Sequence, residues 1–176
     1  ADVSHYVTPG ARIDKEALER GTSVYLVDRT IPMLPERLSN GICSLVEGED
    51  RLTFSAVFTM NVKGDVLHEW FGRTVIHSAK RFSYEEAQGV IDMGRGPHAE
   101  TLRSLNQIAK ALREERIRSG AIAFEAEEVK FELNKNGKPL RVYKKILQDT
   151  NKLIEEFMLL ANKRVATLIA TKDKRA

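Results

Sequence analysis

The sequence predicts an α/β domain of the α+β type, in which a mixed or antiparallel sheet with long hairpins packs around a central, buried C-terminal helix. Residues 52–60 alternate between apolar and polar side chains, which is typical of a strand packed on one face. Residues 102–112 carry apolar side chains at helical spacing. Residues 149–170 are apolar around most of a helical circumference, which favours a helix buried at the centre.

The first elements follow from local signals. Val3 and Val7 are apolar positions that indicate a strand. Asp14 can cap a short helix over residues 15–20, and Gly21 supplies its C-terminal stop.

Residues 23–27 are then expected to form a second strand. Residues 31–35 hold two prolines, which remove backbone donors and fix φ, so they indicate an apolar loop rather than a helix or a central strand. Residues 39–41, Ser-Asn-Gly, predict a turn.

A long hairpin is the strongest local prediction. Its first strand has an apolar face made of Leu52, Phe54, Ala56, Phe58 and Met60. Residues 61–65 make the turn, and residues 66–78 return as a strand on which Trp70, Gly72 and Ile76 share one face.

Helices follow this hairpin. Ser83 and Glu86 form a capping box at the start of the first, and Gly120 ends the second. A second hairpin spans residues 121–146 and turns at residues 134–137, before the last helix at 149–170.

Composition narrows the function only weakly. The net charge of +3 permits a phosphate-binding face without demanding one. A lone cysteine, Cys43, excludes an intrachain disulfide and a cysteine-based zinc site, and it fits a reducing, cytoplasmic location. We expect no membrane contact, because no apolar run approaches the ~20 residues of a spanning helix.

No catalytic centre is visible in the residues themselves. The phosphate-binding loop, the dinucleotide fingerprint and the nucleophile elbow are all missing from the sequence. The four histidines lie in unrelated elements without the spacing of metal ligands, and no aspartate cluster could gather magnesium ions. We therefore expect no catalytic residue, metal or cofactor within this chain.

Longer motifs are far more specific. They are Ala1-Asp2-Val3-Ser4-His5-Tyr6-Val7, Gly21-Thr22-Ser23-Val24-Tyr25-Leu26, Ile31-Pro32-Met33-Leu34-Pro35, Leu38-Ser39-Asn40-Gly41-Ile42-Cys43-Ser44-Leu45, and Leu153-Ile154-Glu155-Glu156-Phe157-Met158-Leu159-Leu160-Ala161-Asn162. With these motifs the chain closely resembles the catalytic (RNB) domain of the ribonuclease II and ribonuclease R family of processive 3′→5′ exoribonucleases. The resemblance covers essentially all of residues 1–176.

The resemblance implies a single fragment of that domain. In the family, aspartates before the first strand hold magnesium, and further catalytic residues follow the central helix. We therefore expect the full-length parent to use magnesium and the isolated chain to be inactive, with apolar surface that favours self-association.

It also implies three RNA-binding residues. Tyr25 matches a tyrosine of the family that packs on the terminal nucleotide. Phe124 matches a phenylalanine on which the base stack ends, and Glu156 matches a carboxylate that contacts the terminal nucleotide. A ribose 2′-OH could donate to that carboxylate. For Tyr25 and Phe124 the alternative is a core position, and for Glu156 it is a buried salt bridge.

The expected function is part of a hydrolytic exoribonuclease that degrades single-stranded RNA, with this segment holding the RNA 3′ end. One alternative is a catalytically inactive RNA-binding relative of the same family. Another is an unrelated basic α/β binding module.

Overall fold

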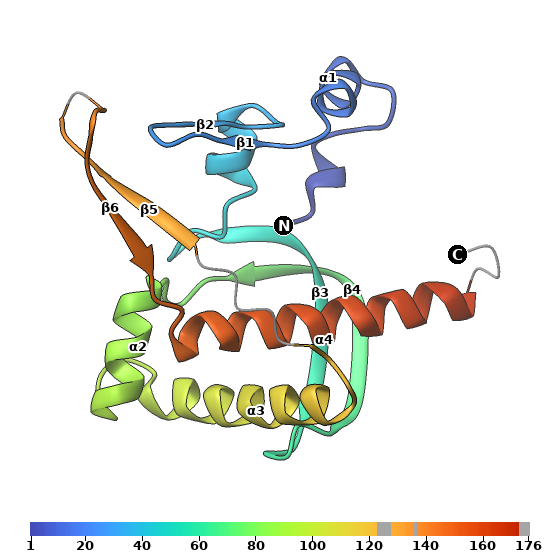
Figure 1. Ribbon diagram of the computed structural model, residues 1–176. Coiled ribbons are helices and arrows are strands. Elements are labelled where there is room, and N and C mark those ends of the chain that lie inside the picture. Colours follow the sequence, from blue (N-terminus) through green and yellow to red (C-terminus); the bar gives the residue numbers. More distant parts are fainter. Residues whose placement is uncertain (123–127, 136, 173–176) are drawn as a thin grey trace. The chain divides into compact units, whose positions relative to one another are not determined.

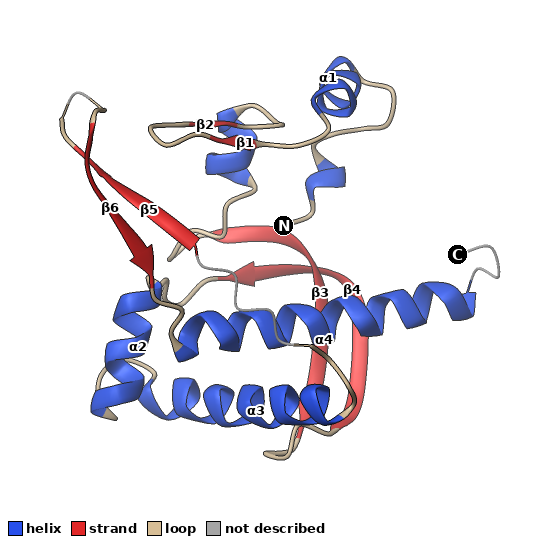
Figure 2. Ribbon diagram, viewed as in Figure 1, coloured by secondary structure: helices blue, strands red, loops and turns tan. Residues whose placement is uncertain are grey.

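The computed structural model describes residues 1–122, 128–135 and 137–172. It confirms the predicted mixture of helices and antiparallel hairpins. The chain forms two compact units, the first made of Ala1–Ser55, Gly72–Arg81 and Glu127–Lys145, the second of Ala56–Phe71, Phe82–Ala126 and Ile146–Ala176. Figure 1 follows the chain in colour and Figure 2 marks its helices and strands.

The first unit begins with a short helix where a strand was predicted. Residues Val3–His5 form the 3₁₀ helix η1. The carboxylate of Asp2 accepts hydrogen bonds from the Ser4 hydroxyl at 2.6 Å and the His5 amide at 3.2 Å. These local bonds close a helical turn, so the strand indicated by Val3 and Val7 is wrong.

Helix α1 spans Arg12–Arg20 and begins earlier than predicted. Ala11 is its N-cap residue, whereas Asp14 lies in the first turn and accepts a 2.7 Å hydrogen bond from the Gly10 amide. Gly21 ends the helix with φ of +66°, a left-handed conformation that glycine adopts without a Cβ penalty. The predicted stop is confirmed, and the predicted cap is wrong.

A very short hairpin follows α1. Strand β1, Val24–Tyr25, pairs antiparallel with β2, Thr30–Ile31. The predicted strand over 23–27 is therefore longer than the observed one. The predicted turn at 39–41 lies instead within η2, a π-helix over Arg37–Ile42 that is interrupted by the non-helical backbone of Gly41.

Strands β3, Asp50–Met60, and β4, Val66–His77, form the predicted long hairpin. In the first unit its buried side chain is Thr53, at 4% exposure, whereas Phe54 is 60% exposed. The hydroxyl groups of Thr53 and Ser55 lie 2.7 and 2.6 Å from that of Thr74. Because hydrogen bonds satisfy these hydroxyls, the polar face can be buried here, and the predicted apolar inward face is wrong for Phe54.

The same hairpin follows the predicted pattern in the second unit. Phe58 and Met60 are half-buried, and the Phe58 ring meets the Phe71 ring edge-on with centroids 5.9 Å apart. On β4 of this unit, Trp70 is exposed, so the predicted shared face is wrong for that residue, whereas Gly72 and Ile76 in the first unit are half-buried as predicted.

Three helices make up most of the second unit. Helix α2, Tyr84–Met93, starts with the predicted capping box, in which Ser83 and Glu86 exchange hydrogen bonds of 3.1 and 2.8 Å. Helix α3, Ala99–Arg118, and helix α4, Asp149–Lys172, pack on each other and on α2. Buried apolar residues at these contacts are Ala87, Val90, Ala109 and Leu153.

Burial of α4 is confined to its beginning. Thr150, Leu153 and Glu156 are buried, but Met158 is 60% exposed and Ile169 49% exposed. The predicted central burial therefore holds only for the first two turns. None of the described helices is long and apolar enough to span a membrane.

Strands β5, Glu128–Leu133, and β6, Pro139–Lys145, form the second predicted hairpin within the first unit. They pair antiparallel, with Val129 opposite Lys144 and Glu132 opposite Arg141, and the register shifts between Glu132 and Leu133.

Candidate functional site

Of the two predicted site residues that the structure describes, Tyr25 is the more exposed. Its side chain on β1 is 80% exposed, and its backbone pairs with Thr30 of β2. Beyond this pair, the Leu26 amide donates a 2.8 Å hydrogen bond to the Arg29 carbonyl and closes the turn. The alternative of a core tyrosine is excluded within the described residues, so the ring is free to stack on a ligand.

The base of this hairpin is held by side chains from both of its ends. The Met33 amide donates to the Ser23 hydroxyl at 2.9 Å. Arg20 at the end of α1 donates to the Pro32 carbonyl at 3.2 Å and pairs with Glu16 at 2.8 Å. The motif residues between Gly21 and Pro35 therefore fix the strand that presents Tyr25.

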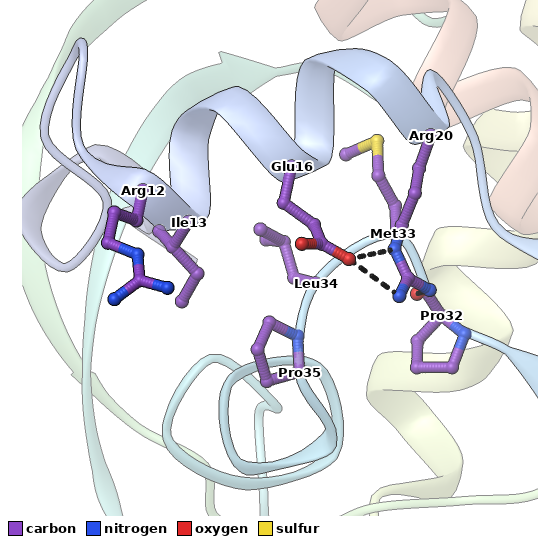
Figure 3. A pocket seen from close by; sticks show the side chains of 8 residues that line it. All are labelled: Arg12, Ile13, Glu16, Arg20, Pro32, Met33, Leu34 and Pro35. Carbon is purple, nitrogen blue, oxygen red and sulfur yellow. Dashed lines mark hydrogen bonds and ion pairs between the residues drawn. The ribbon is translucent and has the colours of Figure 1, made fainter.

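Figure 3 shows how α1 and the proline-containing loop face each other. They enclose an open cavity of about 530 Å³, with Arg12 at one end and the Glu16–Arg20 pair at the other. Ile13, Met33, Leu34 and Pro35 supply its apolar wall. The loop packs against α1 through this wall, as expected of an apolar segment at the surface.

Glu156 lies in the second unit in a buried ion pair. It is 3% exposed, and its two carboxylate oxygens accept hydrogen bonds from Arg116 Nη2 at 2.5 Å and Arg116 Nε at 3.1 Å. Arg116 Nη2 also lies 3.3 Å from Glu155 Oε1. The buried salt bridge that was the alternative for Glu156 is thus present, which leaves its contact with RNA a prediction.

Arg116 was not foreseen as a site residue. The hydrogen bond to Glu156, followed by the charges of Glu156 and Glu155, raises the pKa of Arg116 against the opposing effect of burial. A buried carboxylate at Glu156 needs a cationic partner, so the sequence implied that one exists. Nothing in the sequence identified Arg116 as that partner.

A cavity of about 480 Å³ opens beside this pair. Its apolar lining comes from Leu112, Leu159 and Leu160, and its charged lining includes Arg116, Glu156 and Lys163. The arrangement places a carboxylate, a guanidinium and an apolar wall around one space. Such a space suits a small ligand with both polar and apolar faces.

The start of α4 is fixed by a second set of polar contacts. Lys110 of α3 pairs with Asp149 at 2.7 Å, and this contact lowers the pKa of Asp149, with a smaller contribution from Asn106. Thr150 donates its hydroxyl to the Tyr84 carbonyl at 3.1 Å and its amide to the Gln88 side chain at 3.1 Å. These bonds orient the turn of α4 that carries Glu156.

The remaining predicted residue, Phe124, lies outside the described residues. Tyr25 belongs to the first unit and Glu156 to the second.

The residues present do not by themselves fit a magnesium site. In the part of the chain that the structure describes, no three histidine, cysteine or acidic side chains are grouped so that they could hold a metal ion. Asp2 is buried, but the Ser4 hydroxyl, and then Arg73 at 3.1 Å, lower its pKa and occupy its carboxylate.

Comparison with known families decides where the chain belongs. The family model of the RNB domain matches residues 1–176. The chain belongs to the RNB-domain family. It is 44% identical over 174 residues to Ribonuclease R of Thermotoga maritima and 42% identical over 172 residues to the exosome complex exonuclease RRP44 of Mus musculus. These matches cover 96% of this chain in both cases, but only 24% and 18% of the relatives' lengths.

Solved structures of an RNase R and of a pseudonuclease share the fold. Mycoplasma genitalium RNase R in complex with ribose-methylated single-stranded RNA matches 98% of this chain and 28% of that chain, with a TM-score of 0.90 and 25% identity. The same enzyme with double-stranded RNA matches 98% of this chain and 32% of its own, with a TM-score of 0.91 and 25% identity. Yeast Ssd1, described as a pseudonuclease, matches 98% of this chain and 21% of its own with a TM-score of 0.73 at 21% identity, which shows the fold alone.

Proposed function

We propose that this chain is part of a hydrolytic 3′→5′ exoribonuclease that degrades single-stranded RNA, and that it holds the RNA 3′ end. Membership of the RNB-domain family and relatives named as exonucleases support the reaction. The observation that carries the holding role is Tyr25, an aromatic ring 80% exposed on an anchored hairpin.

Stacking on Tyr25 suits an enzyme without sequence preference. Every base has a π-face, and base–aromatic stacking is worth ~1–3 kcal/mol per base. A fixed strand presents the ring with little loss of conformational freedom on binding, so most of that energy is retained.

Glu156 has a second, dependent role in this proposal. A carboxylate has about four lone-pair sites, of which Arg116 occupies two. The cavity beside the pair gives a ribose 2′-OH room to approach the remaining side. Arg116 then holds the carboxylate oriented as an acceptor for the 2′-OH, a group that RNA has and DNA lacks. Phe124 is proposed, on the resemblance alone, to end the base stack.

The proposal includes magnesium bound by residues of the full-length protein other than those described. The test is release of nucleotides from a labelled single-stranded RNA by that protein, with magnesium and with EDTA. Magnesium-dependent shortening of the RNA from its 3′ end is expected. RNA that stays intact under both conditions would refute the enzymatic part of the proposal.

An inactive RNA-binding relative is the second candidate, because the pseudonuclease Ssd1 shares the fold. This candidate predicts that the full-length protein binds the same RNA without shortening it.

We also propose that the isolated chain hydrolyses no RNA and self-associates through exposed apolar residues of α4, such as Met158. Light scattering of the purified chain should then give a mass above 19.9 kDa.

A further inference from the structure

The positive charge of the chain is concentrated in one hairpin. Residues 128–145, which form β5, its turn and β6, hold six lysines and arginines against two glutamates, a net charge of +4. The whole chain has a net charge of +3, so the remaining residues sum to −1. We call this segment the cationic hairpin. A segment with this excess of positive charge attracts polyanions such as nucleic acids.

Two of these cations lie between β5 and β6. Lys135 and Lys138 are exposed, and neither makes an ion pair with the described residues. Near them, the Asn134 carbonyl accepts a hydrogen bond from the Gly137 amide at 2.9 Å, and the Asn134 side chain accepts one from the Lys138 amide at 3.0 Å. Residues 133–140 include no acidic side chain, so nothing in the turn offsets the two ammonium groups.

One face of the cationic hairpin adds an aromatic surface. Tyr143 is 41% exposed, and the guanidinium carbon of Arg141 lies 5.5 Å from its ring centroid. Glu132, opposite Arg141 in the register, holds that arginine with a 3.1 Å ion pair. An arginine and an aromatic ring presented side by side are the groups on which single-stranded nucleic acids stack.

Gly137 of the cationic hairpin lies close to the turn of the hairpin that carries Tyr25. A Cβ added at Gly137 would lie 3.9 Å from Cβ of Asp28, which is an ordinary van der Waals distance. Asp28 is three positions after Tyr25, a span of at most ~11 Å for an extended chain. Arg29 pairs with Asp28 at 2.6 Å, so the one acidic group at this junction is neutralised locally.

From these observations we infer that the cationic hairpin binds the phosphodiester backbone of RNA next to the nucleotide that stacks on Tyr25. The inference rests on the proposed function and extends it from one terminal nucleotide to the strand that follows. Lys135 and Lys138 contact phosphates, and the Arg141–Tyr143 pair offers a second stacking position. An acidic protein segment would use the charges but would gain little from two exposed tyrosine rings.

The test measures binding of a 5′-fluorescein-labelled single-stranded oligouridylate to the full-length protein as a function of salt, in EDTA so that the RNA stays intact. The double variant Lys135→Ala/Lys138→Ala should bind about 5- to 30-fold more weakly at low salt. Its plot of log affinity against log salt should be shallower by about 1.4, because each phosphate neutralised on a single strand contributes ~0.7.

The matched control is Lys63→Ala/Arg95→Ala, which removes two exposed cations from the second unit. Equal salt slopes for the two double variants would overturn the inference, as would loss of polyglutamate binding with RNA binding unchanged. Both outcomes leave the proposed function standing if Tyr25→Ala still weakens RNA binding. Failure of the unaltered protein to bind the RNA at all would refute the proposed function together with this inference.

Cross-linking gives an independent readout. RNAs with 4-thiouridine at successive positions should label the Tyr25 segment from the 3′ end and residues 128–145 from positions farther from the end. Labelling of residues 128–145 from no position would also overturn the inference.

Discussion

The β1–β2 hairpin and the α3–α4 contact carry the two described site residues in opposite ways. Tyr25 is 80% exposed, whereas Glu156 is 3% exposed and joins two helices through Arg116. Stacking needs an open face, while a carboxylate that must stay ionised and oriented needs a partner. The difference implies that binding and stability can be separated at the first residue and are coupled at the second.

The largest expected effect comes from breaking the buried pair. Arg116→Ala leaves the Glu156 carboxylate buried without its partner and should lower the free energy of unfolding by about 2–4 kcal/mol. The natural control is Arg118→Ala two residues on, since the Arg118 and Glu115 side chains are 73% and 63% exposed and such pairs contribute under ~1 kcal/mol. Urea denaturation measures both variants, and equal losses would show that the Glu156 pair behaves as a surface contact.

The Tyr25 region should show the reverse behaviour. Tyr25→Ala is expected to weaken binding of single-stranded RNA by ~1–3 kcal/mol, because it removes one stacking face. The unfolding free energy should change by less than ~0.5 kcal/mol, as for other surface substitutions. Tyr25→Phe keeps the ring and should keep the binding. If Tyr25→Ala lowered stability as much as Arg116→Ala, the contrast between the two regions would be lost.

A smaller effect is expected at the base of that hairpin. Ser23→Ala removes the acceptor of the 2.9 Å bond from the Met33 amide and should cost ~0.5–1.5 kcal/mol of stability. RNA binding should weaken as well, because the strand that carries Tyr25 is held less firmly. Ser23 would act through this strand, since its side chain bonds to the backbone and not to RNA. Thr22→Val is the control, since the Thr22 hydroxyl makes only an exposed 3.3 Å contact. Identical RNA affinities for the two variants would argue against a positioning role for Ser23.

The elements that sequence predicts well are those with local causes. The capping box of Ser83 and Glu86 and the left-handed stop at Gly21 each need only a few neighbouring residues, and both are confirmed. The strand expected at Val3 fails for the same kind of reason, because the Asp2 side chain bonds to the next turn. The alternation of apolar and polar residues along β3 identifies the two faces of the strand correctly. It does not predict which face is buried, as the hydroxyl cluster of Thr53, Ser55 and Thr74 shows.

The candidate site divides in the same way. A local motif marked Tyr25, whose ring is exposed, and its stacking role stays a prediction. The partner of Glu156 is forty positions earlier in the chain, so it becomes visible only when α3 and α4 are packed together. The cationic hairpin is countable in the sequence, but its contact with the Tyr25 hairpin depends on tertiary structure.

The smallest expected effect is on the pH dependence of the unfolding free energy, which should involve Asp149 at the start of α4 and not Tyr25. The Lys110 contact holds the pKa of Asp149 below its ordinary 3.8, so the folded state binds the proton less readily than the unfolded chain. The stabilisation is therefore present above about pH 4 and is lost as the pH falls through the lowered pKa. Asp149→Asn should make the unfolding free energy depend less steeply on pH in that range, whereas Tyr25→Ala should leave the slope unchanged. A wild-type slope in Asp149→Asn would mean that other carboxylates, such as Asp2 with its own lowered pKa, govern acid unfolding.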